Sequence, residues 1–306
     1  MKRTIDLRST KGTSIVLFAA SLVVLIGFAS IAVDLGLAMN EKAVLVNATD
    51  AAALAGAQEL VYDRPNADCV AKEYLQKNGV DINNAEVIVS ADGKSINVKT
   101  EKTIDYFFAK VLGISNGNVG AYAVAKATPV TGVSSGVRPF AIENQTLVFG
   151  QRYTLKEGAG SGGGGNYGAL ALGGNGANNY RGNIIHGYNG HLGVGDEVDT
   201  EPGNMRGPTE YGVQTLINHC NHSPRCTFDN FQPDCPRIIT VIIVDSLEVH
   251  GRSSVKIVGF ASFFLEDVDV DGGHTKITGR FVKTVTSGET SDVQADYGLR
   301  SVRLVN

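Results

Sequence analysis

The sequence predicts an α+β protein with a transmembrane helix that continues into a long helix, a small α-β-β-α-β domain, and a glycine-rich, mainly antiparallel β domain. Three observations lead to this fold class. The run from Gly12 to Val33 is apolar, uncharged and long enough to cross a bilayer as a helix. The stretch that follows is rich in Ala and Leu and free of proline up to Pro65. After Cys235, apolar or alternating runs separated by Gly, Asp, Ser and Asn indicate strands.

The N-terminal tail sets the expected membrane topology. It contains a single acidic residue, Asp6, and four basic ones, Lys2, Arg3, Arg8 and Lys11. Basic residues next to a membrane span favour the cytoplasmic side. We therefore expect a cytoplasmic tail at residues 1–12, a transmembrane helix at 13–33 that contacts lipid, and an extracytoplasmic body after Asp34.

A cleaved secretory signal is the rival interpretation of this N-terminus. Ser30-Ile31-Ala32 has the small-x-small pattern of a cleavage site. The apolar run is longer than the ~7–15 residues of a signal core, and no helix breaker follows it. We expect one uncleaved helix from about Thr13 to Leu60, roughly 70 Å long, with residues 34–61 as a helical stalk.

Small residues form a stripe on this stalk. They are Ala48, Ala51, Ala52, Ala55 and Gly56. Small residues let helices approach closely, so one interpretation is a surface for helix–helix assembly with partner proteins. The other is that the stripe packs on the protein's own small domain.

Residues 62–130 are expected to form that small α+β domain. The predicted elements are a helix at 67–79, strands at 85–90 and 95–100, a second helix at Ile104–Leu112, and a strand at 119–130. The predicted core comprises Val87, Val89, Ile96, Val98, Tyr106, Phe107 and Leu112.

Several phrases of the N-terminal region occur in a fixed order. They are Lys11-Gly12, Ala32-Val33-Asp34, Gly36, Lys42 and Asp50–Ala57, which reads DAAALAGA. Over residues 11–60 they resemble the N-terminal domain of the Tad/Flp pilus-assembly TadE/TadG-like family. The resemblance implies a membrane-anchored structural or assembly (pseudopilin-like) component whose partners are pilus-assembly proteins or pilin.

Two features known from related proteins do not fit this sequence. Longer TadG-like proteins carry a von Willebrand A-type domain with a D-x-S-x-S metal site. The nearest candidate, Val241–Val249, has Leu247 and Val249 where serines are needed. Prepilin-like cleavage after Gly12 is disfavoured because Leu17 stands where mature pilins carry Glu.

Composition and motifs argue against several function classes. The whole chain has 27 Lys and Arg and 31 Asp and Glu, of which the tail holds four and one, so 23 and 30 remain beyond it. An acidic body disfavours a nucleic-acid partner. The sequence contains no G-x-S-x-G, H-E-x-x-H or P-loop, so we expect no enzyme and no cofactor. The alternative functions are a membrane-stalked adhesin or polymer-binding module and, third, a metal-dependent hydrolase.

The last predicted unit, residues 131–306, begins with a glycine-rich segment. Residues 158–212 hold 18 of the 37 glycines without a three-residue period, which excludes collagen. Closely spaced aromatic and aliphatic residues predict a turn-dense structured segment, loosest at Gly158–Gly165. The match of Gly160-x-Gly162-x-x-Gly165 to a dinucleotide fingerprint has no strand–turn–helix context and is attributed to chance.

Three of the four cysteines are close together in the sequence. Cys220, Cys226 and Cys235 lie within sixteen residues, whereas Cys69 is distant. In an exported domain this clustering favours a disulfide-stapled loop. The alternatives are free thiols or a zinc site that also uses His219 and His222, although the spacing is not that of a C-x₂-C knuckle.

An acidic run near the C-terminus resembles the start of a calcium loop. Asp267, Asp269 and Asp271 precede Gly272 with the spacing of such a loop. Its twelfth position is Thr278 rather than Glu. A β-hairpin that alternates Val inward and Asp outward accounts for the same residues.

Overall fold

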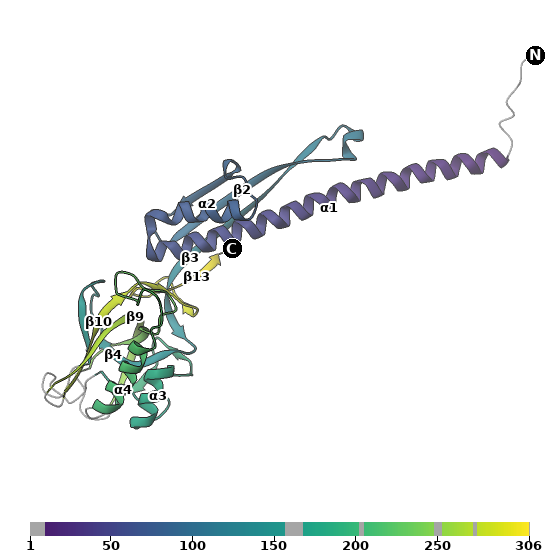
Figure 1. Ribbon diagram of the computed structural model, residues 1–306. Helices are drawn as coiled ribbons and strands as arrows, with labels where there is room; N and C mark the ends of the chain where they lie inside the picture. Colours follow the sequence, from purple (N-terminus) through teal and green to yellow (C-terminus); the bar gives the residue numbers. More distant parts are fainter. Residues whose placement is uncertain (1–9, 157–167, 202–204, 248–252, 272–273, 306) are drawn as a thin grey trace, which may run out of the picture.

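The computed structural model describes residues 10–156, 168–201, 205–247, 253–271 and 274–305. Figure 1 shows a long helix, α1, that leads into an elongated first lobe lying along it, and a second, more compact lobe beyond. Helix α1 covers Thr10–Tyr62 and is about 80 Å long. The predicted fold class is confirmed, since this apolar helix precedes a mainly β body with two sheets.

The two halves of α1 have different surroundings. Side chains from residue 12 to 29 are exposed on every face of the helix. From Ser30 onward, one stripe becomes covered at intervals of three or four residues, which is the spacing of one helix face. It includes Asp34, Glu41 and Leu45 and continues into the alanines. The first half is therefore free to lie in lipid, and the second half is part of the first lobe.

A sheet and a second helix enclose the covered half of α1. The turn Arg64–Asn66 (η1) leads into α2 (Ala67–Lys77), and Ile82–Asn84 (η2) leads into β1 (Ala85–Val89). Strand β2 covers Ser95–Asp105 and β3 covers Asn116–Val133. Alanines of α1 and α2 pack on Ile96, Val98 and Ala125 of the sheet. Helix α2 and the β1–β2 hairpin agree with the sequence prediction.

The C-terminal strand completes this first sheet. The strand order is β1-β2-β3-β13-β11, with β13 at Leu299–Val305 and β11 at Thr284–Val285. Strand β13 pairs antiparallel with β3, from Arg300 opposite Pro129 to Val305 opposite Val124. The sequence prediction placed residues 298–305 in the sheet of the second domain, and this was wrong. Alternation reports which side of a strand is buried but not which strand is its partner.

The second lobe is built on another sheet, with the order β4-β8-β9-β10-β5. Its strands are β4 (Val137–Glu143), β5 (Arg152–Lys156), β8 (Ile238–Val244), β9 (Ser254–Asp271) and β10 (His274–Val282). Strand β4 is parallel to β8, and the other pairs on this path are antiparallel. The short strands are β6 (Leu192–Gly193) and β12 (Glu289–Thr290), which pair with β3, and β7 (Glu197–Asp199), which pairs with β9.

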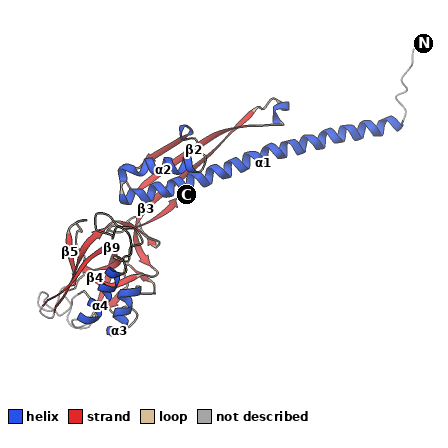
Figure 2. Ribbon diagram, viewed as in Figure 1, coloured by secondary structure: helices blue, strands red, loops and turns tan. Residues whose placement is uncertain are grey.

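Two helices, visible in blue in Figure 2, cover one face of this sheet. They are α3 (Ala177–His186) and α4 (Arg206–Asn218), and they arise from the glycine-rich region where turns were expected. Gly212 explains their close contact, because a Cβ there would lie 2.6 Å from Ile184 Cγ2. Glycine lowers helix propensity by about 1 kcal/mol, and this masked both helices in the sequence.

The helix predicted at Ile104–Leu112 was also wrong. Strand β2 continues to Asp105, and only a short 3₁₀ turn, η3 (Ala109–Leu112), follows it. Phe107 was predicted to be in the core, but 71 % of its surface is exposed. Ile96 and Val98 are buried as predicted, and Val87 and Val89 are half-buried.

Candidate functional sites: a membrane-proximal hairpin tip and a cysteine–histidine cluster

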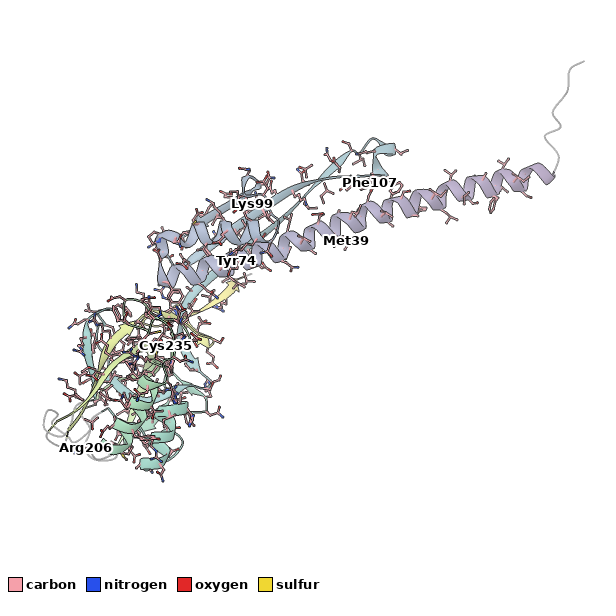
Figure 3. The ribbon with its side chains drawn as sticks, viewed as in Figure 1. Met39, Tyr74, Lys99, Phe107, Arg206 and Cys235 are labelled. Atoms are coloured by element: carbon pink, nitrogen blue, oxygen red, sulfur yellow. The ribbon has the colours of Figure 1, made fainter. Side chains whose placement is uncertain are left out.

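The tip of the β2–β3 hairpin, residues 106–115, presents apolar side chains to the outside. Val111 is 88 % exposed, and Ile114 and Phe108 are about half exposed. Figure 3 shows Phe107 at this tip, which lies beside α1 on the membrane-span side of Met39. Exposed apolar residues that cluster at one point usually mark an interaction with lipid or protein.

Asp34 fixes the position of the hairpin tip. Its carboxylate accepts hydrogen bonds from the backbone N–H groups of Phe107, Phe108 and Ala109, at 2.7–2.9 Å. These amides precede or begin η3, where a turn of helix lacks internal partners for its N–H groups. Asp34 is only 4 % exposed. A buried carboxylate is stable there because three donors satisfy it.

Further contacts hold the hairpin along the helix. Glu41 of α1 forms an ion pair with Lys102 of β2 at 2.6 Å. About two helical turns after Glu41, the hydroxyls of Thr49 and Thr100 are 2.8 Å apart and buried. Together with Asp34, these residues connect helix and hairpin at three successive levels.

An apolar hollow lies between the hairpin tip and the predicted transmembrane segment. It has a volume of about 480 Å³ and is lined almost entirely by carbon. Its residues are Val23, Val24, Ile26, Gly27, Phe28, Ser30 and Ile31 of the span and Phe108 and Val111 of the tip. The tip therefore continues the apolar surface of the span beyond the helix itself.

The stripe of small residues on α1 faces the protein's own sheet. Ala48, Ala52, Ala55 and Gly56 are buried, and Ala51 is half-buried. A Cβ on Gly56 would approach Ile96 Cδ1 to 2.6 Å and the Ala67 carbonyl oxygen to 3.1 Å. These residues serve close packing inside the first lobe. The expectation of a free helix–helix assembly surface on them is corrected, since the chain itself occupies that face.

A second candidate site lies in the loop between α4 and β8, where three thiols and an imidazole converge. The ligand atoms of Cys220, His222, Cys226 and Cys235 all lie within 4.8 Å of one another. Cys220 Sγ is 3.6 Å from Cys235 Sγ and 3.8 Å from His222 Nδ1. Figure 3 labels Cys235 inside the second lobe. All three cysteines are buried.

Neighbouring groups tune and orient this cluster. Burial alone would raise the pKa of Cys220, but hydrogen bonds from His222 and from the backbone amides of Cys226 and His222 outweigh it and lower that pKa. Burial raises the pKa of Cys235. The thiol of Cys220 and the carboxylate of Asp234 raise the pKa of His222, whose Nε2 lies 3.2 Å from Asp234 Oδ1. Both pKa shifts favour the charged forms, a Cys220 thiolate beside a protonated His222.

A comparison with known protein families identifies the N-terminal helix. Residues 12–59 match the family described as "Putative Flp pilus-assembly TadE/G-like". This part of the helix is similar to the TadE/G-like family, and residues 12–59 are called the TadE/G-like segment below. This match confirms the resemblance inferred from the sequence motifs. No curated protein and no solved structure matches the chain.

The TadE/G-like segment covers both the apolar span of α1 and the half of α1 that packs in the first lobe. It begins with the apolar span and ends next to Leu60, the last buried leucine of the helix. It includes Asp34, which binds the hairpin tip, and Gly56, which contacts the sheet. In the described part of the chain, α1 is also the one helix long and apolar enough to span a membrane. By length and composition, this helix is therefore the candidate for a single-pass membrane anchor.

The disulfide expected within Cys220–Cys235 is not formed. All four cysteines are free, and Cys69 is exposed on α2, far from the others in sequence. The sequence singled out these three cysteines and favoured a disulfide over zinc or free thiols, and the structure places His222, one of the two histidines considered for zinc, beside them. His219, the other predicted ligand, is exposed and stands outside the cluster.

The three aspartates proposed for calcium lie on strand β9. Asp267 pairs with Thr278, Asp269 with Lys276 and Asp271 with His274 of β10. An extended strand does not curl its side chains around one ion as a calcium loop does. The hairpin interpretation is thus correct and the calcium-loop interpretation is wrong. Of the three aspartates, the structure describes the side chains of Asp267 and Asp269.

Some features discussed from the sequence lie outside the described residues. The basic tail up to residue 9, the Gly158–Gly165 segment with its dinucleotide-like pattern, and the last two residues of Val241–Val249 belong to this group.

Proposed function

We propose that this protein is a membrane-anchored, extracytoplasmic structural component of Tad/Flp pilus assembly, pseudopilin-like, and that it acts by binding rather than by catalysis. The observation that carries the proposal is the match of residues 12–59, which make up the membrane anchor and the packed half of α1. We extend the proposal from this helix to the rest of the chain because the first lobe is built around the helix.

The proposed topology follows from the charges at the two ends of the span. Four basic residues precede it, and Asp34 follows it. The positive-inside rule places the tail in the cytoplasm and both lobes on the opposite side of the membrane.

The hairpin tip gives the anchor a second point of contact with the bilayer. Phe108 and Val111 of the tip line an apolar hollow together with residues 23–31 of the span, and Phe107 beside them is exposed. Transfer of such side chains from water to hydrocarbon is favourable by roughly 25 cal/mol per Å². In our proposal, the tip enters the outer leaflet and sets the angle between α1 and the membrane.

Partner proteins are expected at the transmembrane half of α1. The most apolar 18-residue stretch of this helix has no residue buried within the chain. The alanine stripe, in contrast, is covered by the first lobe. Residues 12–29 can therefore pack against helices of pilin or of other assembly proteins in the membrane.

Deletion of the gene tests the proposed function in a strain that makes Flp-type pili. We expect surface pili, counted by electron microscopy, to be lost and to return with the wild-type gene. A matched variant replaces residues 14–29 by a leucine-rich span of equal length. It keeps the anchor, and we expect it to insert in the membrane without restoring pili.

Adhesion of the same cells separates the proposal from the membrane-stalked adhesin. If the protein is an adhesin, the deletion strain should keep normal pili but bind surfaces poorly. That combination would contradict the proposed role in pilus assembly.

A further inference from the structure

We propose that Cys220, His222, Cys226 and Cys235 bind a structural zinc ion in the second lobe. Three thiols and one imidazole form a ligand set that zinc prefers in structural sites. The four residues come from a loop of sixteen residues, yet their ligand atoms meet within a sphere of a few ångströms.

Two distances within the cluster are close to those of tetrahedral coordination, and every ligand atom lies within 4.8 Å of the others. With a Zn–S bond of about 2.3 Å, two sulfurs of a tetrahedron lie about 3.8 Å apart. With a Zn–N bond of about 2.0 Å, a sulfur and a nitrogen lie about 3.5 Å apart. The observed separations are 3.6 Å for Cys220 and Cys235 and 3.8 Å for Cys220 and His222. A disulfide needs about 2.05 Å and would use only two of the three thiols.

The surroundings of the cluster resemble those of zinc ligands. His222 directs Nδ1 to the sulfurs, while its Nε2 lies 3.2 Å from the Asp234 carboxylate. A carboxylate on the second nitrogen of a ligating histidine fixes its tautomer and orientation. The backbone N–H of Gln232 donates to Cys226 Sγ at 3.4 Å, which suits a sulfur carrying negative charge.

The loop between α4 and β8 has little regular structure of its own, so a bound metal ion would stabilise it. Residues 219–237 connect α4 to β8, and their one described β-bridge joins Thr227 and Asn230. Loops of this length without secondary structure are uncommon in compact domains. The cluster packs on Phe264 and Val282 of the sheet, and the buried Arg237 side chain donates to the Cys226 carbonyl at 2.7 Å. Zinc would hold the end of α4 on the start of β8.

Metal analysis of the full-length protein tests this inference. The protein is extracted from membranes in detergent without chelator, and its zinc is measured by plasma mass spectrometry. We expect one zinc ion per chain. Cys235→Ser and His222→Asn should reduce zinc to background, whereas the matched controls Cys69→Ser and His219→Asn, which change exposed residues outside the cluster, should retain it.

Cobalt binding keeps the test decisive if the cluster variants fail to fold. Wild-type protein stripped of metal and reloaded with Co²⁺ should show thiolate charge-transfer bands and the strong visible bands of tetrahedral cobalt. The inference is overturned if wild-type protein contains no zinc and binds no cobalt. It is equally overturned if peptide mapping without reductant finds a disulfide between two of the three cysteines, or if iron or copper occupies the site.

Discussion

At the scale of single residues, two positions in the TadE/G-like segment have a clear physical purpose. Asp34 supplies one carboxylate to three backbone amides of the hairpin tip. Gly56 lets α1 approach Ile96 and α2 more closely than any side chain would allow. The sequence identified both as parts of a motif, but it suggested a charge boundary for Asp34 and left Gly56 between a partner surface and packing on the protein's own small domain. Asp34 binds residues 73 to 75 positions away and Gly56 approaches Ile96, 40 positions away, and local patterns do not reveal such contacts.

Replacement of Gly56 by alanine should destabilise the first lobe. The added Cβ would overlap Ile96 and crowd the backbone of Ala67. We expect a loss of about 1–3 kcal/mol from overpacking, which exceeds the gain of roughly 1 kcal/mol in helix propensity. Gly36→Ala is the matched control, because a Cβ there has nothing within 4 Å. Chemical unfolding of both variants in detergent measures the difference. Equal stability of the two variants would contradict the packing role of Gly56.

Sequence reasoning also located the cysteine cluster but not its chemistry. Cys220, Cys226 and Cys235 were singled out correctly, and the oxidising compartment favoured a disulfide. Of the two histidines considered for zinc, the structure brings His222 and not His219 to the cysteines, and it adds Asp234 as the partner of His222. The zinc measurement described above decides between these chemistries.

At the scale of elements, the success of prediction follows the length and regularity of each pattern. Helix α1 was predicted within three residues at each end, because its composition persists for many turns. Helices α3 and α4 were missed because glycines interrupt them. The residues around Phe107 and Phe108 were assigned to a buried helix because apolar pairs at helical spacing normally indicate a core. Here they form an exposed tip beside the predicted membrane span, where we propose that their apolar side chains contact lipid.

Contact of the hairpin tip with lipid can be measured with a fluorescent reporter, because the chain contains no tryptophan. We expect Val111→Trp, reconstituted in vesicles, to emit at shorter wavelength and to be quenched by brominated lipid. Tyr122→Trp is the matched control, an exposed site on β3 roughly 20 Å from the tip. Adding Asp34→Ala should reduce quenching in the first variant by releasing the tip. Equal quenching of the two tryptophan variants would contradict insertion of the tip.

At the scale of the whole molecule, the last strand of the chain belongs to the first lobe. Strand β13 returns from the second lobe to pair with β3 of the first, and β3 itself runs from the first sheet into the second lobe. These two strands make both lobes depend on each other. Figure 1 shows the C-terminus beside α1. The sequence predicted the α+β class, with a long N-terminal helix before a mainly β body, but it did not reveal the pairing of β13 with β3, because strands so far apart leave no local pattern.

The account rests on the claim that α1 places both lobes outside the cytoplasm, and Cys69 allows a direct measurement. This thiol is exposed on α2, whereas the other three cysteines are buried. A membrane-impermeant maleimide added to spheroplasts should label wild-type protein but not Cys69→Ser. A second variant that combines Cys69→Ser with Ser9→Cys in the tail should be labelled only after the membrane is permeabilised. Labelling of Cys69 only after permeabilisation would place the body in the cytoplasm and contradict the account.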